Sequence, residues 1–284
     1  MTLEEKYTRV QTILHELGSV LVAFSGGVDS SFLARAASET LGDKAQAVTA
    51  WSEHSPEFDP DELNRLVRTL GIRHHTLVYD EFDIPHLAQN SVERCYRCKH
   101  YLFSNFQRIA RENALDCVID GSNADDVHDF RPGIRALQEL KIRSPLREAG
   151  LTKDEIRALS KQLDLPTWNK PSTPCLATRV PYGMELTPEI LKAIGKGERF
   201  LRKLGFRQNR VRHHGSIARI ELVDKDMRRV ILGNLGAPIT AYFKQIGYSY
   251  TTLDLQGFRS GSMNEVLQNT DRAEESDRHI ENTG

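Results

Sequence analysis

The sequence predicts an α/β protein: a parallel, twisted sheet with helices on both faces, followed by a small C-terminal α+β lobe. Short apolar runs alternate with amphipathic helical patterns through the first half of the 284 residues, an order that is typical of parallel sheets. One of these runs, at 20–24, passes through two glycines directly into a helical pattern. After the proline-rich stretch 169–174 the order changes to helix, two strands, helix and strand, which indicates a second lobe.

The spacing of apolar residues predicts each element. In the first lobe we expect helices at 7–17, from 32 onward, at 60–70 and at 99–112, and strands at 20–24, 45–51, 73–78 and 116–120. In the second we expect a helix at 187–204, helical structure of unspecified division at 226–246, and strands at 208–213, 217–223 and 248–253. Ligands of parallel sheets bind beyond the carboxyl ends of the strands, which places along one rim Phe24, Trp51, Asp80 and Asp120.

These elements divide the chain into a first domain at 1–170 and a C-terminal lobe at 171–268. We expect a disordered tail at 269–284, because it is polar and charged with little apolar content. The 38 Lys and Arg residues balance 39 Asp and Glu residues, so the overall charge indicates no attraction to nucleic acid or to a membrane.

The location of the protein is expected to be cytoplasmic. The N-terminus lacks the basic and apolar regions of a signal peptide, and no stretch approaches the ~20 apolar residues of a membrane span. Four cysteines in so long a chain do not form a disulfide scaffold, which favours a reducing compartment.

The most informative motif is Ser-Gly-Gly-Val-Asp-Ser-Ser at 25–31. Backbone N–H groups and the positive end of the following helix converge in such a turn and bind phosphate. The motif lacks the Gly-Lys-Ser/Thr ending of a Walker loop, so no lysine of the loop reaches the terminal phosphates. It resembles the PP-loop of ATP pyrophosphatases, which split ATP between the α and β phosphates.

Three cysteines form the second constellation. Cys95 and Cys98 have the C-x-x-C spacing of a metal or cluster site, Cys98 falls at the start of a predicted helix, and Cys175 follows the proline-rich stretch. A cubane iron–sulfur cluster held by three thiolates keeps one iron open. A redox dithiol, a zinc site and unrelated cysteines remain alternatives for the pair. Cys117 lies within a predicted buried strand and is expected to belong to the core.

Six segments in order resemble signatures of the LarE family, ATP-dependent sulfur transferases that make the nickel-pincer cofactor of lactate racemase and related enzymes. They are 25–30, 94–99, 120–126 with 131–133, 175–183, 210–215 and 261–265. Only the first is shared across the wider superfamily, so the resemblance rests on the ordered set.

The resemblance implies a two-stage reaction on pyridinium-3,5-biscarboxylic acid mononucleotide. A carboxylate attacks the α phosphate of ATP, pyrophosphate leaves, and sulfur then displaces AMP to give a thiocarboxylate. Cys175 matches the family's sulfur-bearing cysteine. In one branch that cysteine gives up its own sulfur and becomes dehydroalanine; in the other a three-cysteine 4Fe-4S cluster carries the sulfide. The presence of Cys95 and Cys98 favours the cluster branch.

The resemblance also implies site residues. Cys175 and Asp29 are the catalytic candidates, and Cys95, Cys98 and Cys175 are the metal ligands. The ATP-binding candidates are Ala23, Phe24, Ser25, Gly26, Gly27, Val28, Asp29, Ser30, Ser31, Thr49, Trp51 and Gly121. The substrate-binding candidates are Arg179, Glu198, Arg210, Arg212, Glu221, Asp125 and Asp126.

Several substrate-binding candidates also have ordinary interpretations. Arg210 and Arg212 alternate on a predicted strand and share a face, which suits an anionic ligand or simply solvent. Glu198 and Glu221 would orient these arginines, although their positions alone favour the surface. The aspartates 125 and 126 suit either Mg²⁺ or a turn.

The expected cofactors are therefore ATP, Mg²⁺ and a 4Fe-4S cluster. The expected partners are a small nucleotide substrate, a sulfide donor and further copies of the chain, with no nucleic acid or membrane. A PP-loop tRNA thiolase is the main alternative, but it predicts an RNA-binding extension and a basic surface. A nucleotide-sensing or metal-storage module does not account for a complete loop beside three cysteines, and an amidotransferase or NAD-synthetase-like ligase gives the cysteines no use.

Overall fold

The computed structural model describes residues 1–53, 60–128, 132–171, 174–259 and 261–264. It consists of two compact units, Met1–Thr173 and Pro174–Gly284, and each is described by itself. The expected tail and the motif residues Arg131 and Glu265 lie outside the described residues. No helix within the described ranges is long and apolar enough to cross a membrane.

A four-stranded sheet forms the centre of the first unit, and all of its strands are parallel, which confirms the predicted fold class. The order is β3-β2-β1-β4. The strands are β1 (Val20–Ala23), β2 (Ala45–Trp51), β3 (Arg73–Val78) and β4 (Cys117–Ile119). The chain runs outward from β1 through β2 to β3 and then crosses to β4 on the other side of β1. The loop after β1 therefore lies at the switch point where ligands of such sheets bind.

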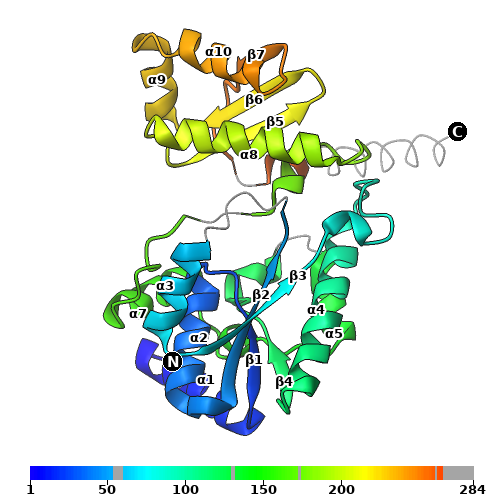
Figure 1. Ribbon diagram of the computed structural model, residues 1–284. Helices are drawn as coiled ribbons and strands as arrows, with labels where there is room; N and C mark the ends of the chain where they lie inside the picture. The colour runs from blue at the N-terminus through cyan, green and yellow to red at the C-terminus, as the bar shows by residue number, and fades with distance from the viewer. Residues whose placement is uncertain (54–59, 129–131, 172–173, 260, 265–284) are drawn as a thin grey trace, which may run out of the picture. The chain divides into compact units, whose positions relative to one another are not determined.

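Helices cover both faces of this sheet (Figure 1). Alternate residues of β1 point to opposite faces: Val20 and Val22 pack in the core beneath α1 and α2, whereas Leu21 packs with residues of α4 and α5. The helices are α1 (Leu3–Leu17), α2 (Val28–Leu41), α3 (Pro60–Leu70), α4 (Arg94–Glu112), α5 (Pro132–Glu139), α6 (Pro145–Glu148) and α7 (Lys153–Gln162).

The second unit holds a mixed three-stranded sheet, as expected for a small α+β lobe. Its strands are β5 (Asn209–His214), β6 (Ile217–Leu222) and β7 (Tyr250–Leu253). The β5–β6 pair is antiparallel and the β6–β7 pair is parallel.

The described part of this unit also holds the helices α8 (Pro188–Lys203), α9 (Asp224–Leu232) and α10 (Gly236–Gln245), of which α8 packs against β5 and α10 against β7. The helical structure expected at 226–246 is confirmed, and it consists of two helices. Gly233 ends α9, and Asn234 follows with a left-handed φ of 54° that no helix can continue.

Candidate active site

The phosphate loop joins the end of β1 to the start of α2. Gly26 has a φ of 69°, a conformation that favours glycine. The Ser30 side-chain oxygen accepts a hydrogen bond from the Ser25 amide at 3.2 Å and lies 3.1 Å from the Ser25 hydroxyl. This serine pair holds the two ends of the loop together. Ser31, by contrast, is fully buried and its amide donates to the Gly27 carbonyl at 3.0 Å.

Gly121 brings the chain after β4 directly against this loop. A Cβ atom at Gly121 would lie 3.1 Å from the Ser30 amide nitrogen and 3.3 Å from the Asp29 carbonyl carbon. These distances leave no room for a side chain without moving backbone. Gly121 is thus required for the close approach of the chain after β4 to the start of α2.

Two lysines from distant parts of the unit reach the loop. Lys153, the first residue of α7, forms an ion pair with Asp29. Lys170 Nζ donates to the Gly26 carbonyl at 3.1 Å and lies 3.0 Å from Glu62 Oε1. The loop therefore has lysines beside it even though its own motif has none, which the sequence motif could not reveal. Both lysines also pair with carboxylates, Lys153 with Asp29 and Lys170 with Glu62.

A polar contact under the loop involves a histidine that sequence reasoning missed. Thr49 Oγ1 donates to the Phe24 carbonyl at 2.6 Å and lies 2.8 Å from His74 Nε2. Burial lowers the pKa of His74 to about 4, so its imidazole is neutral at neutral pH. Since the Thr49 proton is already donated, Nε2 of the neutral ring donates to Thr49. Trp51, at the end of the same strand, accepts the Tyr79 amide through its carbonyl at 3.0 Å.

The acidic residues after β4 accept hydrogen bonds from backbone amides and serine hydroxyls of the first unit. Asp125 Oδ2 accepts the amide of Lys153 at 2.8 Å at the start of α7, and Asp126 Oδ2 accepts the Asn123 amide at 2.9 Å. The buried Asp120 accepts hydroxyl hydrogen bonds from two serines, 122 and 144. The side chain of Asn123 also reaches Asp29 Oδ1 at 3.5 Å, so this turn supports the carboxylate at the phosphate loop.

The C-x-x-C pair lies inside α4, which begins at Arg94, five residues earlier than predicted. Cys95 and Cys98 are half-buried, and their spacing of three puts them on one face of the helix. The neighbouring Arg94 is 4% exposed, bonds Asn90, and places Nη2 3.9 Å from Cys95 Sγ. A fixed positive charge therefore lies beside the pair.

The remaining cysteine of the first unit has a different environment. Cys117 begins β4, where its Sγ donates to the Ser19 carbonyl at 3.7 Å. Burial raises the pKa of this thiol to about 11, so it is protonated at neutral pH. Among the described residues, no group of three or more His, Cys, Asp or Glu side chains has the arrangement of a metal site.

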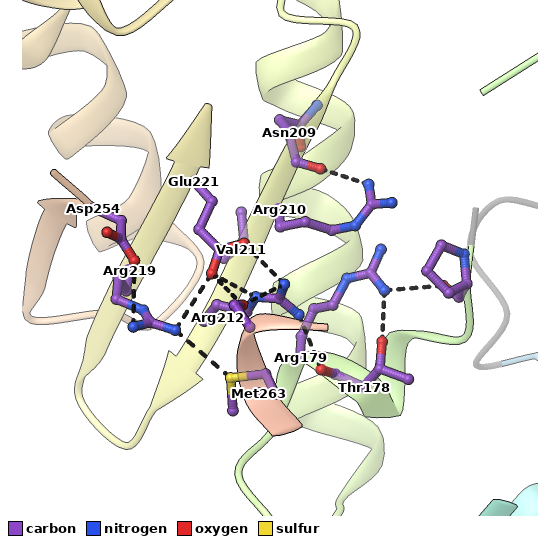
Figure 2. A network of polar contacts seen from close by, with 12 residues as sticks. Thr178, Arg179, Asn209, Arg210, Val211, Arg212, Arg219, Glu221, Asp254 and Met263 are labelled. Carbon is purple, nitrogen blue, oxygen red and sulfur yellow. Dashed lines mark hydrogen bonds and ion pairs between the residues drawn. The ribbon is translucent and has the colours of Figure 1, made fainter. Parts of the chain in front are cut away.

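In the second unit, Cys175 is exposed and precedes a short 3₁₀ helix, Leu176–Arg179. Figure 2 shows Thr178 and Arg179 of this segment together with arginines and Glu221 of the strands β5 and β6. Arg179 is fully buried and forms a bidentate ion pair with Glu198, through Nε at 2.8 Å and Nη2 at 3.2 Å. Arg212 bonds Glu221 in the same manner, at 3.0 and 2.8 Å.

The two glutamates are completely buried, so the expectation that they favour the surface is wrong. Glu198 bonds Arg179 and the Val211 amide rather than Arg210. Arg210 is half-buried: its Nη1 donates to the Asn209 carbonyl at 2.8 Å, and its guanidinium lies 5.0 Å from the ring of Phe258. A charge can be buried when a partner satisfies it, a property that residue spacing does not show.

Comparison with known proteins identifies relatives of both the first unit and the whole chain. The asparagine synthase family model matches residues 9–173, the unit that holds the loop. The chain is 36% identical to pyridinium-3,5-bisthiocarboxylic acid mononucleotide synthase of Lactiplantibacillus plantarum over 267 residues, which are 94% of this chain and 96% of that protein. The chain belongs to the LarE family.

Other relatives cover different shares of the chain. This LarE-family protein is 40% identical to an uncharacterized protein of Synechocystis over 93% of its own length and 99% of the relative's. It is 28% identical to one subunit of the glutamine-hydrolyzing GMP synthase of Thermococcus kodakarensis, over 66% of its own length and 64% of that protein. The LarE-family chain is thus a PP-loop ATP pyrophosphatase homologue of a sulfur-inserting enzyme.

Proposed function

We propose that this protein adenylates the carboxylates of pyridinium-3,5-biscarboxylic acid mononucleotide with ATP and replaces AMP with sulfur to form thiocarboxylates, a step of nickel-pincer cofactor biosynthesis. The observation that carries the proposal is the 36% identity to the Lactiplantibacillus synthase across nearly all of both chains. The loop at 25–31, with Asp29 and two lysines beside it, supports the proposal.

The need for ATP follows from carboxylate chemistry. Direct displacement would expel oxide, whereas an acyl-adenylate expels AMP, which is a stable leaving group. The attack on the α phosphate builds charge on the phosphate oxygens, and Mg²⁺ bound near Asp29 would neutralise part of it. The loop amides at the start of α2 and the ammonium groups of Lys153 and Lys170 would bind the departing pyrophosphate.

Lys153 can be tested separately from the loop. We expect Lys153→Met to weaken ATP binding about tenfold and to leave AMP binding nearly unchanged, because a charge-assisted phosphate contact is worth ~1.5–3 kcal/mol and AMP lacks the β and γ phosphates. Calorimetric titration with both nucleotides measures the difference. Lys161→Met is the matched control, since Lys161 is also on α7 but lies 5.1 Å from the ring of Trp168. Equal loss of ATP and AMP affinity would contradict the assignment.

The three thiols fit the donor set of an iron–sulfur cluster with one open iron. Cys95 and Cys98 share a helix face beside a buried arginine, and Cys175 is exposed. We propose that these three residues hold a 4Fe-4S cluster, which when bound would supply the sulfide. Because Cys117 has a raised thiol pKa and bonds a backbone carbonyl, it is a poor fourth ligand. The competing sulfur donor is the sulfur atom of Cys175 itself, and the exposure of this residue favours it.

We propose Arg210 as an arginine that binds the anionic substrate. It is half-buried and its guanidinium lies 5.0 Å from the ring of Phe258. We expect Arg210→Ala to weaken substrate binding tenfold or more, for the loss of ~1.5–3 kcal/mol, with ATP binding unchanged. Fluorescence titration with the substrate tests this. If Arg210→Ala binds the substrate like the parent, the substrate lies elsewhere.

The overall activity has a direct test. Anaerobically reconstituted protein is incubated with the pyridinium substrate, ATP, Mg²⁺ and sulfide, and the products are identified by mass spectrometry. Thiocarboxylate, AMP and pyrophosphate in equal amounts support the proposal. Pyrophosphate release that does not depend on the pyridinium substrate would overturn it.

A further inference from the structure

The segment that carries Cys175 is held by two arginines that do not face solvent. We propose that Arg179 and Arg212, each paired with a buried glutamate, form a clamp on the main chain of residues 174–179 and thereby orient Cys175 for sulfur transfer. In this proposal the two arginines are positioning residues rather than substrate ligands. The proposal rests on the proposed function only for the chemistry of Cys175, because the clamp consists of contacts within the second unit.

Arg179 uses opposite edges of its guanidinium for two tasks. One edge bonds Glu198 of α8, and both side chains are fully buried. The other edge, Nη1, donates to the carbonyls of Pro174 at 3.0 Å and Cys175 at 3.3 Å and to the hydroxyl of Thr178 at 2.7 Å. Figure 2 shows Arg179 directed at this segment. The guanidinium therefore ties the main chain around Cys175 to the helix α8.

Arg212 holds the same segment from the sheet. Its Nη1 donates to the Thr178 carbonyl at 3.0 Å while Nε and Nη2 bond Glu221 on β6. Ser262 completes the pair: its hydroxyl donates to Glu221 at 2.8 Å and accepts from Arg212 Nη2 at 2.9 Å. Only 6% of the Arg212 side chain is exposed. Two separate elements, α8 and the sheet, thus hold one short turn.

The main chain of Cys175 is held at its carbonyl. The Cys175 carbonyl accepts from the Thr178 amide at 3.0 Å and the Thr178 hydroxyl at 2.7 Å, in addition to Arg179. Cys175 is nevertheless exposed. A fixed main chain with an exposed side chain is the arrangement that presents a reacting sulfur in one orientation. Burying two ion pairs costs desolvation free energy. Both arginines of these pairs also bond the turn at 174–179, which needs a defined geometry.

The Thr178 hydroxyl allows a test that keeps both ion pairs. Thr178→Val removes the hydroxyl that bonds Arg179 and Cys175, and Thr178→Ser restores it. We expect hydrogen exchange in full-length Thr178→Val to accelerate tenfold or more at the amides of Thr178 and Val180, with the amides of β5 and β6 unchanged. Thr178→Ser should exchange like the parent. Arg202→Ala is the matched control, because Arg202 is also on α8 and lies 3.9 Å from Glu198, with a third of its side chain exposed.

The second readout is the amount of thiocarboxylate formed per pyrophosphate released. We expect this ratio to fall at least fivefold in Thr178→Val and to recover in Thr178→Ser, while substrate-dependent pyrophosphate release stays at the parent level. Unchanged exchange at Thr178 and Val180, or faster exchange throughout the second unit, would overturn the clamp. An unchanged ratio with locally faster exchange would overturn its role in transfer. A parent that forms no thiocarboxylate would instead overturn the proposed function, whatever the exchange shows.

Discussion

Replacing Asp29 by alanine is expected to abolish substrate-dependent pyrophosphate release while the protein stays folded. Asp29 lies in the first turn of α2, where it pairs with Lys153 and accepts from Asn123 at 3.5 Å. Its carboxylate offers Mg²⁺ an oxygen ligand at the phosphate loop. Loss of one group that stabilises transition-state charge costs ~10²–10³ in rate, so activity should fall below detection in a standard pyrophosphate assay.

The control for Asp29→Ala is Asp154→Ala. Asp154 is exposed on the first turn of α7, next to Lys153, and has the same charge. It should leave pyrophosphate release unchanged, which separates a specific site from a general effect of negative charge near the loop. Thermal unfolding should place both variants close to the parent, because the ion pair of Asp29 is partly exposed. A folded Asp29→Ala protein with normal pyrophosphate release would remove Asp29 from the site.

The central strands of the first unit can be predicted because they are mostly apolar and buried. The strands Val20–Ala23 and Ala45–Trp51 confirm those predicted at 20–24 and 45–51, since such runs are typical of buried parallel strands. The helices α5, α6 and α7 are absent from the predicted set. Their signals are nevertheless present: Pro132 and Pro145 begin helices, and Thr152 with Glu155 forms a capping box.

The lysines at the loop show what spacing cannot predict. Lys153 is 124 positions from Asp29 and Lys170 is 144 positions from Gly26, so only the folded chain brings them together. The motif also does not show which glycine needs the left-handed conformation: Gly26 has a φ of 69°, whereas Gly27 has a φ of −83°. Motifs predict chemistry that is local in sequence, and tertiary contacts then decide which side chains complete the site.

On β5 the sequence pattern predicts a likeness that the structure does not show. The alternation of Arg210 and Arg212 predicts one shared role for both. The two side chains share a face, yet Arg212 bonds the buried Glu221 and Arg210 lies over Phe258. Glu221 is even opposite Arg210 in the register of the two strands. Burial separates their environments, and the contacts of Arg212 and Glu221 include Ser262 in the segment 261–264, which spacing along the strand does not include.

Cysteine substitutions are expected to separate the two sources of sulfur. Replacing Cys95, Cys98 or Cys175 by serine should each lower the iron and acid-labile sulfide content of anaerobically reconstituted protein, because three thiolates are proposed to hold a cubane cluster with one open iron. Multiple turnover should be lost with the metal. Pyrophosphate release should persist in all three variants, since the phosphate loop contains no cysteine.

Cys117→Ser is the matched control for these variants. Its half-buried thiol bonds the Ser19 carbonyl, so we expect a small loss of stability with iron content and turnover retained. Loss of the cluster from Cys117→Ser would mean that the ligand set is different from the one proposed.

The sacrificial source makes a different prediction that mass spectrometry can measure. With both Cys95 and Cys98 replaced, Cys175 alone would still deliver one sulfur and lose ~34 Da as it becomes dehydroalanine, the mass of the hydrogen sulfide removed from its side chain. The parent protein after turnover should keep the mass of an intact Cys175 if the sulfide comes from a cluster. Stoichiometric dehydroalanine at Cys175 in the parent, with product limited to one sulfur per chain, would overturn the cluster proposal. The clamp on residues 174–179 would then orient the sulfur atom that is itself transferred.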